Sequence, residues 1–307
     1  MFLVVFLYMV IASTFTIGKA ALEYLHPMFL IGLRMTTAGV LLLGYLYFFK
    51  RSALKFKRKH LFDFASIILF HIFFAFVAEF WALQYLNSSK VCLFYNLSPF
   101  ITAIFSYFWF SEKMTTKKLL GLSIGFFAFL PVLISGESSE IFSSRFLFFS
   151  WPELVMLFSV VSSCFGWVVV RKLGRAGYSM LMINGVGMLG GGLLSFIASF
   201  VVEGAPSLKT VSGSPGTTIA IALGYTMLLI LLANVLFYNL YGYLLKHYTA
   251  TFLSFAGFLT PFFAAIFGWI FLGESVSISF FVTIFLVLIG LYMFYQEELR
   301  QGYIVSK

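Results

Sequence analysis

Charged residues are scarce in this sequence. They make up only 10% of its 307 positions, whereas soluble domains carry about 25%. So little polar material cannot cover a surface that faces water, and this excludes an ordinary soluble protein. Only two cysteines are present, which excludes a disulfide-dense scaffold. Aromatic residues reach 21%, which excludes a disordered chain, because such chains are poor in large apolar side chains.

Sequence motifs of catalysis are also missing. The chain has no His-Glu-x-x-His, no paired cysteine motif, no Gly-x-Ser-x-Gly and no Walker loop. The sequence therefore predicts neither an enzyme nor an ATP-driven pump, and it predicts no metal and no cofactor. No exposed basic domain is available to bind nucleic acid, so nucleic acid is not an expected partner.

Long apolar runs are abundant, since 61% of the residues are hydrophobic. A bilayer-spanning helix needs roughly 20 mostly apolar residues, and in lipid a helix satisfies its own backbone hydrogen bonds. The sequence predicts an all-α integral membrane protein with ten transmembrane helices, expected at Phe2–Leu22, Pro27–Phe49, Leu61–Leu86, Lys90–Phe110, Lys118–Ser135, Pro152–Val170, Ser179–Val202, Thr217–Leu240, Ala250–Leu272 and Ser277–Tyr295.

The basic residues predict the orientation of these helices. Most of the 20 Lys and Arg residues lie in the terminal segments or in loops that follow even-numbered helices, with six of them between Lys50 and Lys59. The other side has only Lys19, Lys90, Arg145 and Lys209. Because basic loops stay in the cytoplasm, both termini are expected on the cytoplasmic side of the cytoplasmic (inner) membrane.

A motif occurs twice, once in each half of the chain. Leu-Ser-Pro-Phe-Ile-Thr-Ala-Ile-Phe begins at Leu97, and Leu-Thr-Pro-Phe-Phe-Ala-Ala-Ile-Phe begins at Leu259. Pro99 and the later Glu112 recur in register as Pro261 and Glu274. A weaker echo relates Phe15–Lys19 to Trp167–Arg171. Because each copy would hold five helices, an odd number, the two copies are expected to form an inverted repeat.

The repeat predicts the organisation of the chain. Residues 1–135 would form the first five-helix repeat and residues 151–297 the second. Residues 136–150 would connect them, and residues 298–307 would form a cytoplasmic tail.

The whole chain resembles the EamA-type carriers of the drug/metabolite transporter superfamily. The resemblance rests on the duplicated Pro and Glu, on Pro27 and Arg34 in the second helix, and on Gly18-Lys19 at the end of the first. It implies a five-plus-five inverted-repeat carrier for a small organic solute. It also implies that Pro99, Glu112, Pro261 and Glu274 serve the architecture. The family carries many solutes, so the resemblance does not name the substrate.

Charges inside the predicted spans are the sharpest candidates for a binding site, because each costs at least a few kcal/mol in the bilayer unless it is paired or hydrated. Glu79 is expected to bind a cationic group or a coupling proton; the alternative is an ion pair with Arg34 or Lys90. Arg34 and Lys90 are charge partners that could instead serve the architecture or, for Lys90, reach the interface. His71 is expected to be a packing residue.

Uncharged polar and aromatic residues complete the predicted chamber. Asn96 precedes Pro99, and a proline inside a helix frees a backbone carbonyl. Asn234, Tyr238 and Tyr241 follow helical spacing and are expected on one face. The full predicted set of substrate-binding residues is Ser13, Thr14, Glu79, Tyr95, Asn96, Trp167, Asn234, Tyr238 and Tyr241. An aromatic, partly charged chamber suits a planar or cationic ligand.

The sequence predicts a secondary carrier for a small zwitterionic or cationic metabolite, similar to an amino acid or to S-adenosylmethionine. Transport would be driven by proton coupling, another ion gradient or metabolite exchange, because no nucleotide site is present. Besides the solute, the lipid bilayer is the expected partner. The alternatives are an exporter of amphipathic drugs or toxic metabolites and, from another class, a membrane enzyme or a lipid-binding protein.

Overall fold

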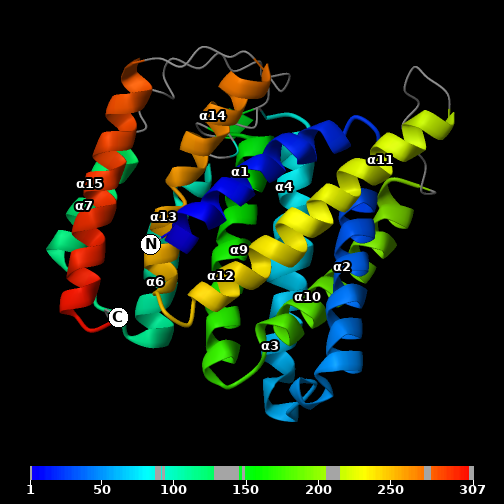
Figure 1. Ribbon diagram of the computed structural model, residues 1–307, viewed down its shortest axis with the longest axis horizontal. Helices are drawn as coiled ribbons and strands as arrows, with labels where there is room; N and C mark the ends of the chain where they lie inside the picture. Colours follow the sequence, from blue (N-terminus) through cyan, green and yellow to red (C-terminus); the bar gives the residue numbers. More distant parts are fainter. Residues whose placement is uncertain are drawn as a thin grey trace.

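The protein is a bundle of helices (Figure 1), seen in a computed structural model that describes residues 2–86, 91, 94–127, 145–146, 149–204, 215–272 and 278–303. Within these ranges, six helices are long and apolar enough to cross a membrane. They span Phe2–Ala21 (α1), Pro27–Phe49 (α2), Arg58–Leu83, Trp151–Arg175 (α9), Met180–Val202 (α10) and Gly216–Leu244. This confirms the prediction of a predominantly α-helical, multi-pass membrane protein in its general form.

Two of the long helices contain a π-helical segment. The third predicted span consists of the 3-10 turn η2 (Arg58–His60), α3 (Leu61–Ser66), the π-helix η3 (Ile67–Phe74) and α4 (Ala75–Leu83). The eighth consists of α11 (Pro215–Leu229), the π-helix η4 (Ile230–Phe237) and α12 (Tyr238–Leu244). In a π-helix the hydrogen bonds run from i to i+5, so residues before and after the segment lose their α-helical phase. Neither π-helical segment was predicted from the sequence.

The fourth and ninth predicted spans are interrupted next to their prolines. A turn at Asn96 and Leu97 precedes α6 (Ser98–Phe110), which contains Pro99. In the ninth span, α13 (Ala250–Ala256) and α14 (Leu259–Leu272) are separated by a turn at Gly257 and Phe258. Pro261 has no N–H to donate to the carbonyl of Gly257. That carbonyl accepts instead from the N–H of Thr260, at 2.8 Å, which tightens the turn.

The remaining elements lie at the other predicted spans and in the linker. The fifth span is described as α7 (Thr116–Phe127) and the tenth as α15 (Ile278–Arg300), which continues into the segment predicted as a tail. In the linker, β1 (Arg145–Phe146) pairs antiparallel with β2 (Phe149–Ser150). A 3-10 turn, η1 (Arg51–Ala53), follows α2.

Helices from the two halves of the chain pack against one another. The pairs in contact are α2 with α10, α6 with α13 and α7 with α15. The α2–α10 contact is close at Gly39, where an added Cβ would lie 2.5 Å from the backbone N of Leu189. Glycine is needed there because the two backbones leave no room for a side chain.

Basic loops gather at one end of the bundle. The connection between α2 and α3, the turn between α9 and α10 and the C-terminal end of α15 all lie at the lower edge of Figure 1. The connection between α2 and α3 contains Lys50, Arg51, Lys55, Lys57, Arg58 and Lys59. Arg171, Lys172 and Arg175 lie at the end of α9, just before the turn, and Arg300 is the last residue of α15. The orientation of these basic segments relative to a membrane stays a prediction.

Candidate functional site

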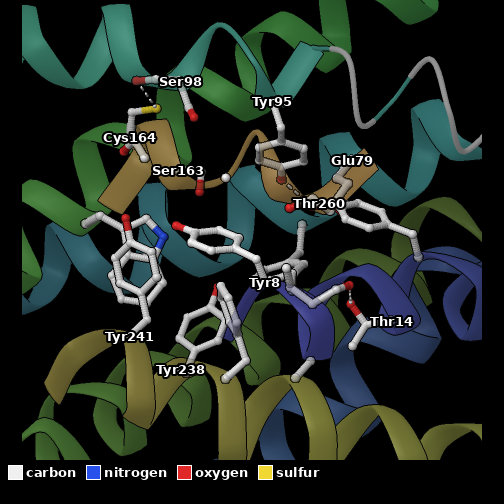
Figure 2. Close-up of a pocket in the computed structure, with 18 of the residues that line it drawn as sticks. Tyr8, Thr14, Glu79, Tyr95, Ser98, Ser163, Cys164, Tyr238, Tyr241 and Thr260 are labelled. Atoms are coloured by element: carbon white, nitrogen blue, oxygen red, sulfur yellow. Dashed lines mark hydrogen bonds between the residues drawn. The ribbon is translucent and has the colours of Figure 1, made fainter. Parts of the chain in front are cut away.

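A cavity lies in the middle of the bundle, among α1, α2, α4, α9, η4 and α12 and the two interrupted spans (Figure 2). Its volume is about 120 Å³, measured as the space open to the centres of water-sized molecules. Six of the predicted binding residues line it, and they are Thr14, Glu79, Tyr95, Trp167, Tyr238 and Tyr241. Residues from distant parts of the sequence thus converge on one chamber, as predicted.

Arg34 contributes a positive charge to the cavity wall. Its side chain on α2 is only 2% exposed, and its Cζ lies 4.6 Å from the ring centre of Phe76 and 4.8 Å from that of Phe80. Such cation–π contacts stabilise a guanidinium without neutralising it. Its Nε has no hydrogen-bond partner among the described residues. Arg34 therefore has donor capacity to offer to an anionic group in the cavity.

Glu79 contributes the negative charge. It lies on α4, is 6% exposed, and accepts a hydrogen bond of 2.6 Å from the hydroxyl of Tyr95. In the described part of the chain, Glu79 and Arg34 do not come within ion-pair distance of each other. The alternative interpretation of Glu79, an ion pair with Arg34, is therefore not supported by a direct contact. Lys90, the other suggested partner, lies outside the described residues.

Aromatic rings form much of the wall away from these charges. The ring centres of Trp167 and Tyr241 are 3.9 Å apart with 32° between their planes, and Tyr238 lies 5.0 Å from Trp167. In Figure 2, Glu79 and Thr14 lie on one side of the cavity, whereas Tyr241 and Cys164 lie on the other. The cavity thus has a charged end and an aromatic end.

Both interrupted spans reach the cavity. Ser98 comes from the start of α6, and Ser254, Gly257 and Thr260 come from the region around the break between α13 and α14. Non-helical backbone inside a membrane is tolerated where it lines a cavity or is buried in protein. This placement fits the expectation that the two prolines free backbone carbonyls next to a chamber.

Three predicted binding residues do not line the cavity. The Ser13 hydroxyl donates a hydrogen bond to the carbonyl of Val10, at 2.7 Å. Asn96 is buried, and its Nδ2 has no hydrogen-bond partner among the described residues. Asn234 is fully buried, and its Nδ2 lies 2.7 Å from Sδ of Met35. The face expected for Asn234, Tyr238 and Tyr241 assumed an unbroken α-helix. Asn234 instead lies inside the π-helix η4, which changes the phase.

Among the described residues, the family-motif positions Pro99, Glu112 and Pro261 do not themselves line the cavity. Glu112, just after α6, is 7% exposed and accepts a hydrogen bond from Nη1 of Arg171 near the end of α9. Pro99 and Pro261 occupy the first turns of α6 and α14. Glu274 lies outside the described residues.

Several lining residues were not predicted from the sequence. They are Tyr8, Ile11, Phe15, Phe76, Phe80, Leu83, Ser163, Cys164, Ala233 and Phe237, together with the residues around the helix breaks. Most are apolar or aromatic, and the chain has so many of these residues that their type alone does not separate cavity wall from lipid-facing surface. Within the described ranges, no three His, Cys, Asp or Glu residues come together as a potential metal site.

Comparisons with known proteins agree with this architecture. The profile of the EamA-like transporter family matches residues 1–134 and 150–296. A solved crystal structure superposes with a TM-score of 0.74 at 15% identity, covering 98% of this chain and 96% of that chain, which supports the fold alone.

Several named proteins are similar in sequence to most of this chain. A protein of Chlamydia trachomatis serovar L2, named S-adenosylmethionine/S-adenosylhomocysteine transporter, is 35% identical over 96% of this chain and 88% of its own length. A protein of the same name from Chlamydia muridarum is 34% identical over 96% of this chain and 91% of its own length. The chloroplastic WAT1-related protein of Arabidopsis thaliana is 27% identical, covering 90% of this chain and 64% of the relative.

The fold and the comparisons define a multi-pass membrane transporter and not an enzyme. The chain belongs to the EamA-like transporter family.

Proposed function

We propose that this chain is a secondary carrier for S-adenosylmethionine, S-adenosylhomocysteine or a closely related zwitterionic metabolite. The observation that carries the proposal is the pairing of a buried guanidinium, Arg34, with a buried carboxylate, Glu79, in one cavity without an ion pair between them. Two opposite charges held apart in a cavity suit a ligand that itself carries both signs. The names of the chlamydial relatives support the choice of ligand.

The two charges match the amino-acid part of such a ligand. Arg34 would bind the carboxylate, because a guanidinium presents several donors to carboxylate oxygens. Glu79 would bind the ammonium group, which S-adenosylmethionine and S-adenosylhomocysteine share. The sulfonium charge is present only in S-adenosylmethionine, so binding through the ammonium allows one site to accept both. Tyr95 holds the Glu79 carboxylate in place by its hydrogen bond.

The proposed transport mechanism is alternating access by two inverted five-helix repeats. Three observations support ten spans in this arrangement. The third and eighth spans each contain a π-helix of eight residues, the fourth and ninth are interrupted beside Pro99 and Pro261, and α2, α6 and α7 pack against α10, α13 and α15. In inverted-repeat carriers, rocking of one repeat against the other exposes a central site to each side in turn.

The proposed orientation places both termini on the cytoplasmic side of the cytoplasmic membrane. The collection of basic loops at one end of the bundle supports it, because such loops remain on the cytoplasmic side. Transport would be driven by exchange or by an ion gradient. Exchange of S-adenosylmethionine for S-adenosylhomocysteine would need no further energy source.

Purified full-length protein in proteoliposomes tests the proposal, with protein-free vesicles as the control. We expect uptake of labelled S-adenosylmethionine, accelerated by S-adenosylhomocysteine inside the vesicles. Absence of uptake and of counterflow by correctly folded protein would refute the choice of substrate. Uptake restricted to amphipathic cations without a carboxylate would support the drug-exporter alternative instead.

A further inference from the structure

The aromatic end of the cavity is built around Trp167. Its ring centre lies 3.9 Å from that of Tyr241 and 5.0 Å from that of Tyr238, with interplanar angles of 32° and 37°. Trp167 and Tyr241 thus lie face toward face, an arrangement that can be continued by a further planar group. All three rings line the cavity.

Trp167 also contacts two rings that are nearly perpendicular to its own. The ring of His71 lies 4.4 Å from it at 75°, and the ring of Phe237 lies 6.3 Å from it at 80°. His71 is 1% exposed. It does not line the cavity. Its contact with Trp167 is therefore a packing contact that restricts the tryptophan ring.

The contact between His71 and Trp167 depends on the small size of Gly166, the residue before Trp167. A Cβ added at Gly166 would lie 2.3 Å from atoms of His71, so any larger residue would displace the imidazole. Glycine at this position lets η3 carry His71 close to α9. The orientation of the Trp167 ring is therefore fixed by tertiary packing.

The aromatic rings nearest the charges already have partners. Phe76 and Phe80 lie against the guanidinium of Arg34, and the hydroxyl of Tyr95 is bound to Glu79. A ligand whose zwitterionic part binds Arg34 and Glu79 would extend its remaining part toward Trp167 and Tyr241. In Figure 2, Tyr241 lies on the side of the cavity opposite Glu79. Stacking on aromatic rings binds heteroaromatic bases with little dependence on their hydrogen-bonding edges.

We propose that Trp167 and Tyr241 form a subsite that stacks the planar base of the substrate, and that His71 is a positioning residue for the Trp167 ring. This inference deepens the proposed function and rests on it. It divides substrate recognition into two parts: the amino-acid part at Arg34 and Glu79, and the base at Trp167 and Tyr241.

The division can be tested with two fragments of the substrate. Methionine has the carboxylate and the ammonium but no base, whereas adenosine has the base but no charge. Two readouts apply: inhibition of labelled S-adenosylmethionine uptake, and the rise in melting temperature that each fragment causes in the purified full chain. The second readout needs no transport, so it serves for variants that bind but do not carry.

Trp167→Leu is the decisive variant. We expect its affinity for adenosine to fall about 10-fold or more, in line with the loss of one stacking contact, while its affinity for methionine stays within about twofold. Arg34→Gln should give the reverse pattern. Phe165→Leu is the matched control, because Phe165 lies on the same helix and packs against Phe70 and Phe105, outside the cavity lining. It should change neither affinity.

His71→Leu tests the positioning role. We expect weaker adenosine binding with unchanged methionine binding, by a smaller factor than in Trp167→Leu. A general packing role would instead weaken both fragments together, and that result would overturn the assignment of His71.

The subsite and the proposed function can fail separately. If the wild type carries S-adenosylmethionine but Trp167→Leu weakens methionine and adenosine equally, the base subsite is wrong and the function stands. If the wild type neither binds nor carries S-adenosylmethionine, the proposed function is wrong. Trp167-dependent binding of adenosine would in that case still support the subsite.

Discussion

Arg171 donates a hydrogen bond to Glu112, joining the end of α9 to the residues that follow α6. The two side chains are only 4% and 7% exposed, and the Arg171 guanidinium also lies over the ring of Phe110, 4.6 Å from its centre. A buried ion pair of this kind is costly to break, because removal of one partner leaves the other charge without compensation.

Glu112→Gln should therefore destabilise the folded protein by about 3–5 kcal/mol. The double variant with Arg171→Met should recover part of this loss, because it also removes the stranded charge. Denaturant titration of the purified protein in detergent gives the two values. Arg300→Met is the control: Arg300 is 71% exposed and 3.8 Å from Glu297, so we expect a loss of at most about 1 kcal/mol. Equal losses in Glu112→Gln and in the control would contradict a buried, energetically coupled pair.

Arg34→Lys should impair substrate binding although the charge is retained. A lysine ammonium is a point charge and cannot present a planar, multi-donor fork to a carboxylate while lying against Phe76 and Phe80. A hydrogen bond to a charged group contributes about 1.5–3 kcal/mol, so we expect the KM for S-adenosylmethionine to rise roughly 10- to 150-fold. Initial uptake rates across a concentration series measure it. An unchanged KM would show that Arg34 serves only the packing of α2.

Glu79→Gln tests the other charge. The amide oxygen can still accept from Tyr95, so the substitution removes the negative charge with little change of shape. We expect the KM for zwitterionic substrates to rise about 10-fold or more and the pH dependence of transport to change. Uptake should be measured from pH 5 to pH 8. Wild-type rate and wild-type pH dependence in this variant would show that Glu79 is not part of the site.

The glycines of α2 offer a paired test of the α2–α10 contact. Gly39→Ala would place a Cβ 2.5 Å from the backbone of Leu189, whereas a Cβ at Gly44 meets nothing within 4 Å. We expect Gly39→Ala to destabilise the protein by about 1–3 kcal/mol through overpacking. Gly44→Ala should be neutral or stabilising by up to about 1 kcal/mol, because alanine favours the helix. The melting temperatures of both variants test this prediction. Similar values for the two variants would argue against a backbone contact at Gly39.

Much of the fold could be predicted from the sequence because hydropathy and span length are strong signals in a membrane protein. The predicted limits of the second helix, Pro27–Phe49, coincide with those of α2, and the interruptions beside Pro99 and Pro261 follow from the missing proline N–H. The association of ten spans into two inverted repeats stays a prediction.

The candidate site could be predicted only in part. Glu79 was found because a charge among aromatic residues is conspicuous, and Trp167 and Tyr241 line the same cavity as proposed. Asn234 was expected beside them but is buried against Met35, because the π-helix that contains it has no recognisable sequence signature. The ion pair between Glu112 and Arg171 was likewise not predicted, since nothing in the sequence specifies how α9 packs against the residues after α6.

The π-helices η3 and η4 have a consequence for how the spans can move. A π turn becomes an α turn when each of its amide donors changes to the carbonyl one residue closer, so the change keeps the backbone hydrogen-bonded in lipid. Such an exchange would turn Glu79, which follows η3, and Tyr241, which follows η4, about the helix axes while the connecting loops stay in place. The two π segments would thus allow the third and eighth spans to turn about their axes, which would move Glu79 on one span and Tyr241 on the other.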